Sequence, residues 1–536
     1  MKRKMITGIL CVAAAVMLGG CSMIRDMRSL LNVKRETENA ATEILEDTGI
    51  EFGYVEEDSC EAYPEIFEPD WNTEEYKFNE ENGWCSAVTS PFSTFSADVD
   101  TASYANVRRM LLEGKEVPEA AVRIEEMINY FDYDYPSATG NEPFSVTTEI
   151  APCPWNEDTK LLLVGLKARE IQQEERTPSN LVFLIDVSGS MDEYNKLPLV
   201  QRAFRLLINE LGEEDTVSIV TYANEDHIVL DGISGSEKTL LCDTVEDLYA
   251  SGGTNGSDGL IMAYKIAEDH FIQGGNNRVI LATDGDLNIG MTDEGSLTRL
   301  IEEKAKSGVY LSVLGFGEGN ISDTNMEALA DHGNGNYNYI DSISEARKVL
   351  IDEAGGTLFT VAKDVKLQVE FNPEKVKGYR LIGYENRTMS AEDFSDDTKD
   401  GGEIGSGHTV TALYEIASTG SSFEISSVTS KYITPDVPEG SGEFSDEWAT
   451  VHIRYKEPDG DESVLMDHIV DETAISDQMS GNLSWAAGVA QVGMVLKDSE
   501  YAGTTDLEEV RSRLKTLTGN DEFREEFVYM MNKIKQ

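Results

Sequence analysis

The chain has 536 residues, which is too long for a single hydrophobic core and predicts two or three domains. A hydrophobic fraction of 40% and a charged fraction of 27% are typical of folded globular proteins. The 99 acidic and 44 basic residues give a net charge of −55. So negative a field repels nucleic acids and anionic lipid headgroups, which argues against nucleic-acid binding.

The first 20 residues have the pattern of a lipoprotein signal peptide. A basic stretch at 2–4 precedes an apolar run at 6–18, and Leu18-Gly19-Gly20 leads directly into Cys21. Small residues just before a cysteine predict cleavage that leaves Cys21 as the lipidated N-terminus. A transmembrane helix is the alternative, but about 15 apolar residues are short for a roughly 30 Å hydrocarbon core. We therefore expect a protein lipid-anchored to the cell membrane, on its extracytoplasmic face.

Two segments follow the signal peptide. Residues 21–90 are acidic, and beyond a short polar helix they lack apolar periodicity, which predicts a tether between membrane and body. Residues 91–178 form an N-terminal flanking segment, with helical spacing at 103–112 and 119–131. Apolar strands are expected in the same segment at 144–150 and 161–166.

Strands and helices alternate through residues 179–355. The strands are expected at 181–186, 217–222, 227–230, 279–283, 309–316 and 337–340. The helices are expected at 199–211, 236–249, 257–271, 297–306, 326–331 and 345–354. Nearly continuous apolar strands between helices are typical of a parallel sheet covered on both faces. The fold class predicted here is α/β, doubly wound, with a mostly parallel sheet.

Residues 356–536 change to strands of alternating polarity and end in helices. The strands are expected at 365–371, 379–384, 410–416 and 451–455, and the helices at 483–496, 507–517 and 522–534. This pattern predicts a flanking β-sandwich followed by C-terminal helices.

The cysteines fit an exported protein, in which disulfides are permitted. Cys60, Cys85 and Cys153 could supply one bridge, and the sequence leaves the pairing open. Cys242 lies on an apolar helical stripe and is expected to be buried. No C-x-x-C pair occurs, which disfavours zinc and thioredoxin-type chemistry.

Oxygen-bearing side chains gather where three segments of the α/β region end or begin. Asp186, Ser188 and Ser190 follow the first strand at a spacing of two, which points them to one side. Thr254 lies in a glycine-rich loop before a helix, and Asp284 follows the strand at 279–283. Ligands bind beyond the carboxyl ends of strands in such sheets. Oxygen ligands without His or Cys predict a Mg²⁺ site, which Mn²⁺ or Ca²⁺ could also occupy.

The hydroxyl groups in this set have a functional consequence. Neutral Ser and Thr ligands leave most of the charge of the cation uncompensated, so it can accept one more anionic oxygen. We expect Asp186 and Asp284 to act mainly through bound water. The sequence therefore predicts a partner, a protein or matrix ligand, that offers an Asp or Glu carboxylate.

These residues resemble the von Willebrand factor type A domains that carry a metal-ion-dependent adhesion site. Asp186, Ser188 and Ser190 match D-x-S-x-S, Thr254 matches the threonine of the family and Asp284 its last aspartate. The resemblance covers residues 179–355 and implies cation-dependent adhesion. In family members that switch affinity the last helix moves, and the segment at 345–354 could do the same.

The flanks are similar to those of a subfamily of bacterial exported lipoproteins with this domain. The resemblance rests on the segments 93–104, 125–131, 379–387 and 405–415. We expect strands from before and after the central domain to combine into one composite β-sandwich.

Other interpretations of the sequence are weaker. Asp98-Val99-Asp100 could begin a calcium loop, but the glycine and glutamate of an EF-hand do not follow, so a helix start is favoured. No G-x-S-x-G, H-E-x-x-H or P-loop motif occurs, so no enzyme is predicted. The predicted function is a surface lipoprotein that binds a protein ligand through a cation. The alternative is a structural or regulatory component of a cell-envelope assembly.

Overall fold

The computed structural model describes a body that begins at Thr73. It covers residues 73–140, 142–171, 176–224, 226–254, 256–285, 294–353, 359–399, 401–425, 444–458, 460 and 462–534. The predicted signal peptide, Cys21, the polar helix and Cys60 lie outside these ranges. Within the ranges, no helix has the length and apolar character needed to cross a bilayer.

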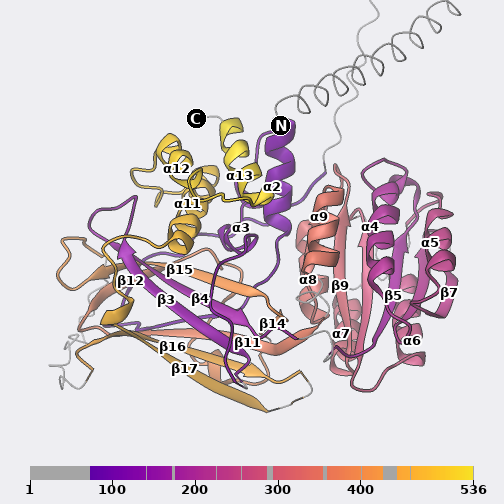
Figure 1. Ribbon diagram of the computed structural model, residues 1–536, viewed down its shortest axis with the longest axis horizontal. Helices are drawn as coiled ribbons and strands as arrows, with labels where there is room; N and C mark the ends of the chain where they lie inside the picture. The colour runs from indigo at the N-terminus through magenta and orange to yellow at the C-terminus, as the bar shows by residue number, and fades with distance from the viewer. Residues whose placement is uncertain are drawn as a thin grey trace, which may run out of the picture. The chain divides into compact units, whose positions relative to one another are not determined.

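The central domain is built on a six-stranded sheet with the order β10-β9-β8-β5-β6-β7 (Figure 1). Its strands are β5 Ser179–Asp186, β6 Thr216–Tyr222, β7 His227–Ser234, β8 Asn276–Thr283, β9 Val309–Phe316 and β10 Tyr337–Ile340. Every pairing is parallel except that of the edge strand β7, which runs antiparallel to β6. All residues of β5 and β8 are buried, because helices cover both faces. The predicted doubly wound, mostly parallel fold is confirmed.

Helices form one hydrophobic core on each face of this sheet. One core takes side chains from α6 Gly256–Asp269, α7 Glu294–Lys306 and α8 Asp323–His332. The other takes them from α4 Leu197–Glu210, α5 Lys238–Glu246 and α9 Ile343–Arg347. Helix α9 continues as the π-helical turn Lys348–Asp352, and together they occupy most of the helix predicted at 345–354.

Two further sheets pack face to face as a β-sandwich. One has the order β1-β12-β15-β4-β3, with β1 Cys85–Ser86, β12 Val376–Ile382, β15 Thr409–Ser418, β4 Lys160–Ala168 and β3 Phe144–Pro152. The other has the order β13-β2-β11-β16-β17, with β13 Thr388–Met389, β2 Phe92–Ser96, β11 Thr360–Phe371, β16 Glu447–Lys456 and β17 Ser463–Asp471. Strand β14, Gly402–Gly405, pairs with β11.

The sandwich joins chain segments from both sides of the central domain. Strand β2 pairs with β11, and β4 pairs with β15, so each sheet contains strands from both flanks. Their inward side chains form one shared core, with Phe95 and Leu166 from the first flank beside Leu367 and Tyr414 from the second. The composite sandwich inferred from the sequence is therefore confirmed.

Helices from both flanks share a third core beside the sandwich (Figure 1). They are α2 Ala102–Glu113, α3 Ile124–Asn129, α11 Gly481–Leu496, α12 Leu507–Leu514 and α13 Glu522–Met530. The single helix predicted at 119–131 is divided, because Val122 and Arg123 are extended. The Arg123 N–H donates to Ser103 Oγ at 2.9 Å, which a continuous helix would prevent.

The structure differs from the sequence interpretation at several further points. Residues from 73 onward, assigned to the tether, contact the body: Glu74 pairs with Arg109 at 3.0 Å, and β1 pairs with β12. Cys85 and Cys153 are free thiols, so the bridge considered between them is wrong. Cys242 is half-buried rather than buried, because only part of it reaches the core under α5.

Asp98 and Asp100 lie at the junction of the two flanks and the central domain. Both carboxylates pair with Arg387, at 3.2 and 3.1 Å, and Asp100 also accepts from the Tyr337 N–H at 2.8 Å. The Asp98-Val99-Asp100 segment therefore precedes α2 as an ion-paired connection between segments.

Candidate metal centre

Asp186, Ser188 and Ser190 lie together where β5 ends. The Ser188 N–H donates to Asp186 Oδ1 at 2.8 Å, which fixes the turn after the strand. The hydroxyl oxygens of Ser188 and Ser190 are 3.0 Å apart. The chain is extended only as far as Ser188, and Gly189–Met191 form a 3-10 turn, so this turn and not an extended segment brings the two hydroxyls together. The two hydroxyls lie on one side, as the sequence predicts, but for a different reason.

The loop that carries Thr254 packs directly on this turn. The Ser251 N–H donates to Val187 O at 2.7 Å, and the Gly189 N–H donates to Gly252 O at 2.9 Å. Asn224 supports the same loop by accepting from the Gly253 N–H at 2.7 Å. Gly252 has a φ of +86°, and a Cβ there would lie 2.5 Å from Asn224 Nδ2, so glycine is required. These backbone contacts bring the segment of Thr254 beside the turn of β5.

Asp284 approaches from the neighbouring strand. Strands β5 and β8 are paired in register up to Ile185 and Ala282, so Asp186 and Asp284 leave the same edge of the sheet. Thr283 Oγ1 lies 3.5 Å from Asp186 Oδ2. Both aspartates are fully buried. The structure thus gathers the segments of all five predicted site residues at one sheet edge.

Two buried carboxylates set the electrostatics of this edge. Burial raises the pKa of Asp186 to about 6, and the Asp284 carboxylate adds to the shift, while hydrogen bonds from Ser188 oppose it. Two buried carboxylates beside a pair of hydroxyl oxygens form a hard oxygen donor set, which suits Mg²⁺. Among the described residues no group of three or more His, Cys, Asp or Glu could hold a metal.

Comparisons with known proteins match the same three parts of the chain. Family models described as "von Willebrand factor", "von Willebrand factor type A domain" and "Uncharacterized protein YfbK, C-terminal" match residues 70–163, 180–352 and 356–536. A relative described as "Uncharacterized protein YfbK", from Escherichia coli (strain K12), is 42% identical over 468 residues. The alignment spans 86% of this chain and 80% of that relative. The chain belongs to the YfbK family.

More distant matches are confined to parts of the chain or to low identity. Human inter-alpha-trypsin inhibitor heavy chain H4 is 29% identical over 165 residues, which are 29% of this chain and 18% of that protein. A solved structure described as "von Willebrand factor type A from Catenulispora acidiphila" has 16% identity and a TM-score of 0.42. It covers 75% of this chain and 92% of its own.

In this YfbK-family chain the site also contains a lysine that the sequence interpretation missed. Lys196 Nζ lies 3.1 Å from Asp284 Oδ2 and 3.2 Å from Asn320 Oδ1. Lys196 directly precedes α4, and lysines in loops are usually solvated. Its position six residues after Ser190 was the only available signal, and spacing alone does not show that a long side chain turns inward.

Two exposed tyrosines lie on the loops around the metal centre. Tyr194 is 78% exposed and lies two residues before Lys196, and Tyr249 is 76% exposed and lies two residues before Ser251. Exposed aromatic rings beside a polar centre are typical of protein-binding surfaces. Sequence reasoning missed both, because an isolated tyrosine has no distinguishing pattern.

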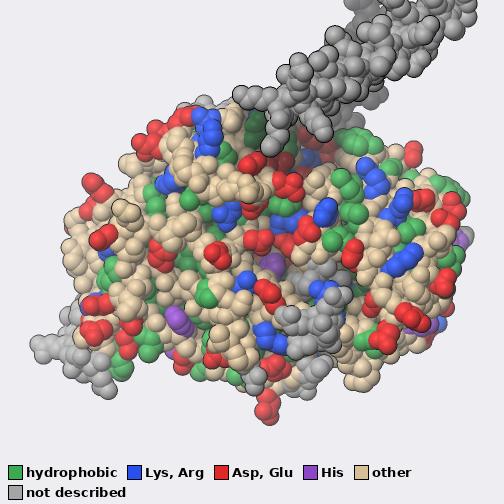
Figure 2. Space-filling model, in the orientation of Figure 1, with side chains coloured by type: hydrophobic (Ala, Val, Ile, Leu, Met, Phe, Trp, Pro, Cys, Tyr) green, Lys and Arg blue, Asp and Glu red, His purple; other side chains and the backbone are tan. Residues whose placement is uncertain are grey.

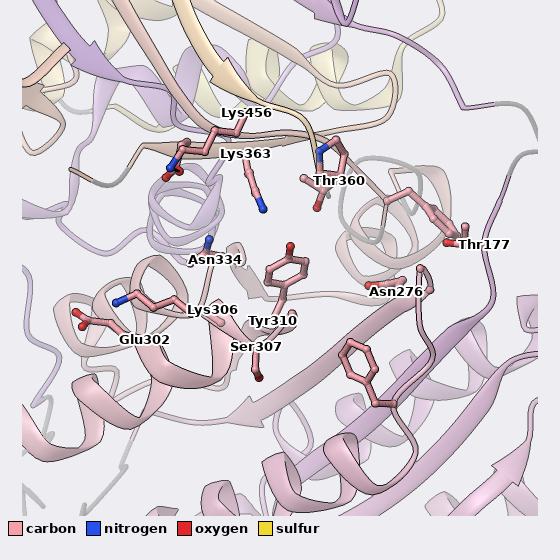
Figure 3. Close-up of a pocket in the computed structure, with 18 of the residues that line it drawn as sticks. Thr177, Asn276, Glu302, Lys306, Ser307, Tyr310, Asn334, Thr360, Lys363 and Lys456 are labelled. Atoms are coloured by element: carbon pink, nitrogen blue, oxygen red, sulfur yellow. Dashed lines mark ion pairs between the residues drawn. The ribbon is translucent and has the colours of Figure 1, made fainter. Parts of the chain in front are cut away.

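The YfbK-family body also has a cavity of about 940 Å³ away from the metal centre. It lies between the sandwich and the opposite edge of the central sheet, where β8 begins at Asn276. Figure 3 shows Lys363 and Tyr310 pointing into it from opposite sides. Carboxylates offset the basic groups near it, since Lys456 pairs with Asp364. The metal centre remains the better candidate site.

Proposed function

We propose that this chain is a surface lipoprotein that binds a protein ligand through a divalent cation. One observation carries the proposal: three loops meet at one sheet edge and bring the turn of Asp186, Ser188 and Ser190 beside the segments of Thr254 and Asp284. The type A domain supports a role in protein interaction or adhesion. We propose no catalytic role.

The donor set suits Mg²⁺, with Mn²⁺ or Ca²⁺ as substitutes. Ser188, Ser190 and Thr254 would supply neutral oxygens, while Asp186 and Asp284 would accept hydrogen bonds from bound water. A cation held by these residues would attract one carboxylate oxygen of the partner. Because the hydroxyl ligands carry no charge, that carboxylate is attracted strongly.

The charge of the whole chain restricts the kind of partner. Figure 2 shows acidic side chains spread over the visible face, interleaved with lysine and arginine. A net charge of −55 repels an acidic protein at long range. We therefore expect a neutral or basic protein that presents a local Asp or Glu to the site.

The metal centre is tested by calorimetric titration with Mn²⁺ and Mg²⁺. Asp186→Ala and Thr254→Ala should each abolish cation uptake and the capture of partners that EDTA releases. Both variants should stay folded, because the site lies at the rim of the sheet. Asp192→Ala removes an exposed carboxylate from the same loop and should bind the cation normally. Absence of cation uptake by the unmodified chain would refute the proposal.

The anchor is tested by changing the predicted lipidation site. We expect Cys21→Ser to move the protein from the membrane fraction to the soluble exported fraction, because the thiol that accepts the lipid is lost. Cys242→Ser, a change of another thiol, should leave the protein in the membrane fraction. Equal membrane association of the Cys21 variant and the unmodified chain would contradict lipid anchoring.

A further inference from the structure

Lys196 is a buried cation next to one of the two site carboxylates. Only 3% of the residue is exposed, and its ammonium group contacts Asp284 and Asn320, with the more exposed Glu193 carboxylate at 3.8 Å. Gly317, with a φ of +77°, leaves room for its stem, since a Cβ there would lie 2.4 Å from Lys196 Cε. Burying an ammonium group is costly unless it is paired. The fold is therefore built to hold this lysine against Asp284.

The carboxylates of Asp284 and Asp186 therefore differ in the groups that contact them. Asp284 Oδ2 has an ammonium group at 3.1 Å, whereas Asp186 accepts from the Ser188 N–H at 2.8 Å. No ion pair joins Asp186 to a Lys or Arg in the described part of the chain. Lys196 therefore offsets one of the two negative charges that a divalent cation would find at this edge.

We propose that Lys196 strengthens the dependence of cation binding and acidic-ligand binding on each other. The inference rests on the proposed function and concerns the regulation of the same site. With one carboxylate already neutralised, the site holds a divalent cation less tightly. The bound cation then keeps more positive charge, and this excess attracts a carboxylate of the partner.

The dependence must be reciprocal. If the bound cation strengthens carboxylate binding by some factor, a carboxylate strengthens cation binding by the same factor. The site would then be occupied mainly when cation and acidic partner arrive together. Without them, Lys196 serves as the internal counter-ion of Asp284.

The test measures Mn²⁺ binding to the full chain by electron paramagnetic resonance, with acetate as the carboxylate probe and chloride at equal ionic strength as reference. Acetate should tighten Mn²⁺ binding to the unmodified chain several-fold. Lys196→Met, which keeps most of the length of the side chain without its charge, should bind Mn²⁺ in chloride about tenfold more tightly. Acetate should raise the Mn²⁺ affinity of this variant by a smaller factor than that of the unmodified chain. Lys196→Arg keeps the charge and should behave like the unmodified chain.

A second variant keeps the test decisive if Lys196→Met does not fold. Asn320→Asp places a carboxylate beside the ammonium group and offsets its charge, so it should shift Mn²⁺ affinity in the same direction. The matched control is Lys348→Met, which removes another buried lysine, one paired with Glu353, and should not change Mn²⁺ affinity.

The outcomes separate this inference from the proposed function. If Lys196→Met and Asn320→Asp bind Mn²⁺ like the unmodified chain and gain as much from acetate, the role of Lys196 is wrong and the metal centre stands. If neither the unmodified chain nor the variants take up Mn²⁺, the metal centre itself fails and the inference fails with it.

Discussion

Glu125, on α3, is a buried carboxyl group that the fold holds at a cost. It is fully buried, with no Lys or Arg paired to it among the described residues. Burial raises its pKa to about 8, and the carboxylates of Glu385 and Asp98 add to the shift. The unfolded chain releases this proton near its ordinary pKa of about 4.3, whereas the folded chain keeps it until about pH 8.

The pH dependence of stability follows from this difference. Glu125 adds no pH-dependent penalty below its unfolded pKa, and this penalty grows as the pH rises from about 4.3 to about 8. We expect Glu125→Gln to reduce the loss of unfolding free energy between pH 5 and pH 8 by about 1 to 4 kcal/mol. Urea unfolding at several pH values measures this free energy. The control is Glu116→Gln, which removes an exposed carboxyl group. Parallel pH profiles for all three proteins would contradict this role.

The sequence predicted the residues of the metal centre whose positions follow from their spacing relative to the end of a strand. Asp186 ends β5 and Asp284 directly follows β8, and the apolar runs identify both strands. Ser188 and Ser190 come together through a 3-10 turn, which the spacing of two did not predict. Lys196 and Glu125 were not predictable, because their burial depends on what distant segments place around them. Gly317 and Asn320 lie more than a hundred residues after the lysine that they accommodate.

At the scale of elements, apolar periodicity predicted most strands and helices of the central domain, because each is covered by neighbours in a regular way. Strand β17 was missed, since this edge strand exposes Val464, Leu465 and Ile469 and so lacks a clean alternation. The predicted helix at 119–131 was divided by a contact with Ser103, which local propensity does not encode.

The two loops at the rim of the metal centre lead to a prediction about specificity. We expect the double change Tyr194→Ser, Tyr249→Ser to weaken binding of a partner captured in Mg²⁺ by about tenfold or more, since exposed aromatic side chains dominate many interfaces. Mn²⁺ uptake should not change, because neither ring is among the predicted ligands. Tyr529→Ser, on α13 and 55% exposed, is the control for loss of a surface tyrosine. Unchanged partner affinity in the double variant would place the interface elsewhere.

At the scale of the whole molecule, Arg387 joins the three parts of the body. It belongs to the second flank and pairs with Asp98 and Asp100 of the first flank. It also pairs with Asp331 of α8 in the central domain, at 2.8 Å. Burial and the neighbouring Asp98 raise the pKa of Asp100, so this cluster depends on the guanidinium group. The composite sandwich was predictable from flanking strands, but this buried junction was not, because its partners are far apart in sequence.

Removing the guanidinium group of Arg387 should uncouple the unfolding of the two flanks from that of the central domain. We expect Arg387→Met to cost about 3 to 5 kcal/mol, because it leaves several largely buried carboxylates without a counter-charge. Arg454→Met breaks a more exposed pair with Asp397 in the same sandwich and should cost about 0 to 1 kcal/mol.

All five tryptophans lie outside residues 179–355, so their fluorescence follows the flanks, while circular dichroism follows the whole body. Urea transitions by the two methods should coincide in the unmodified chain and separate in Arg387→Met. Coincident transitions in that variant, at no greater cost than for Arg454→Met, would show that the parts are held together by their apolar contacts instead.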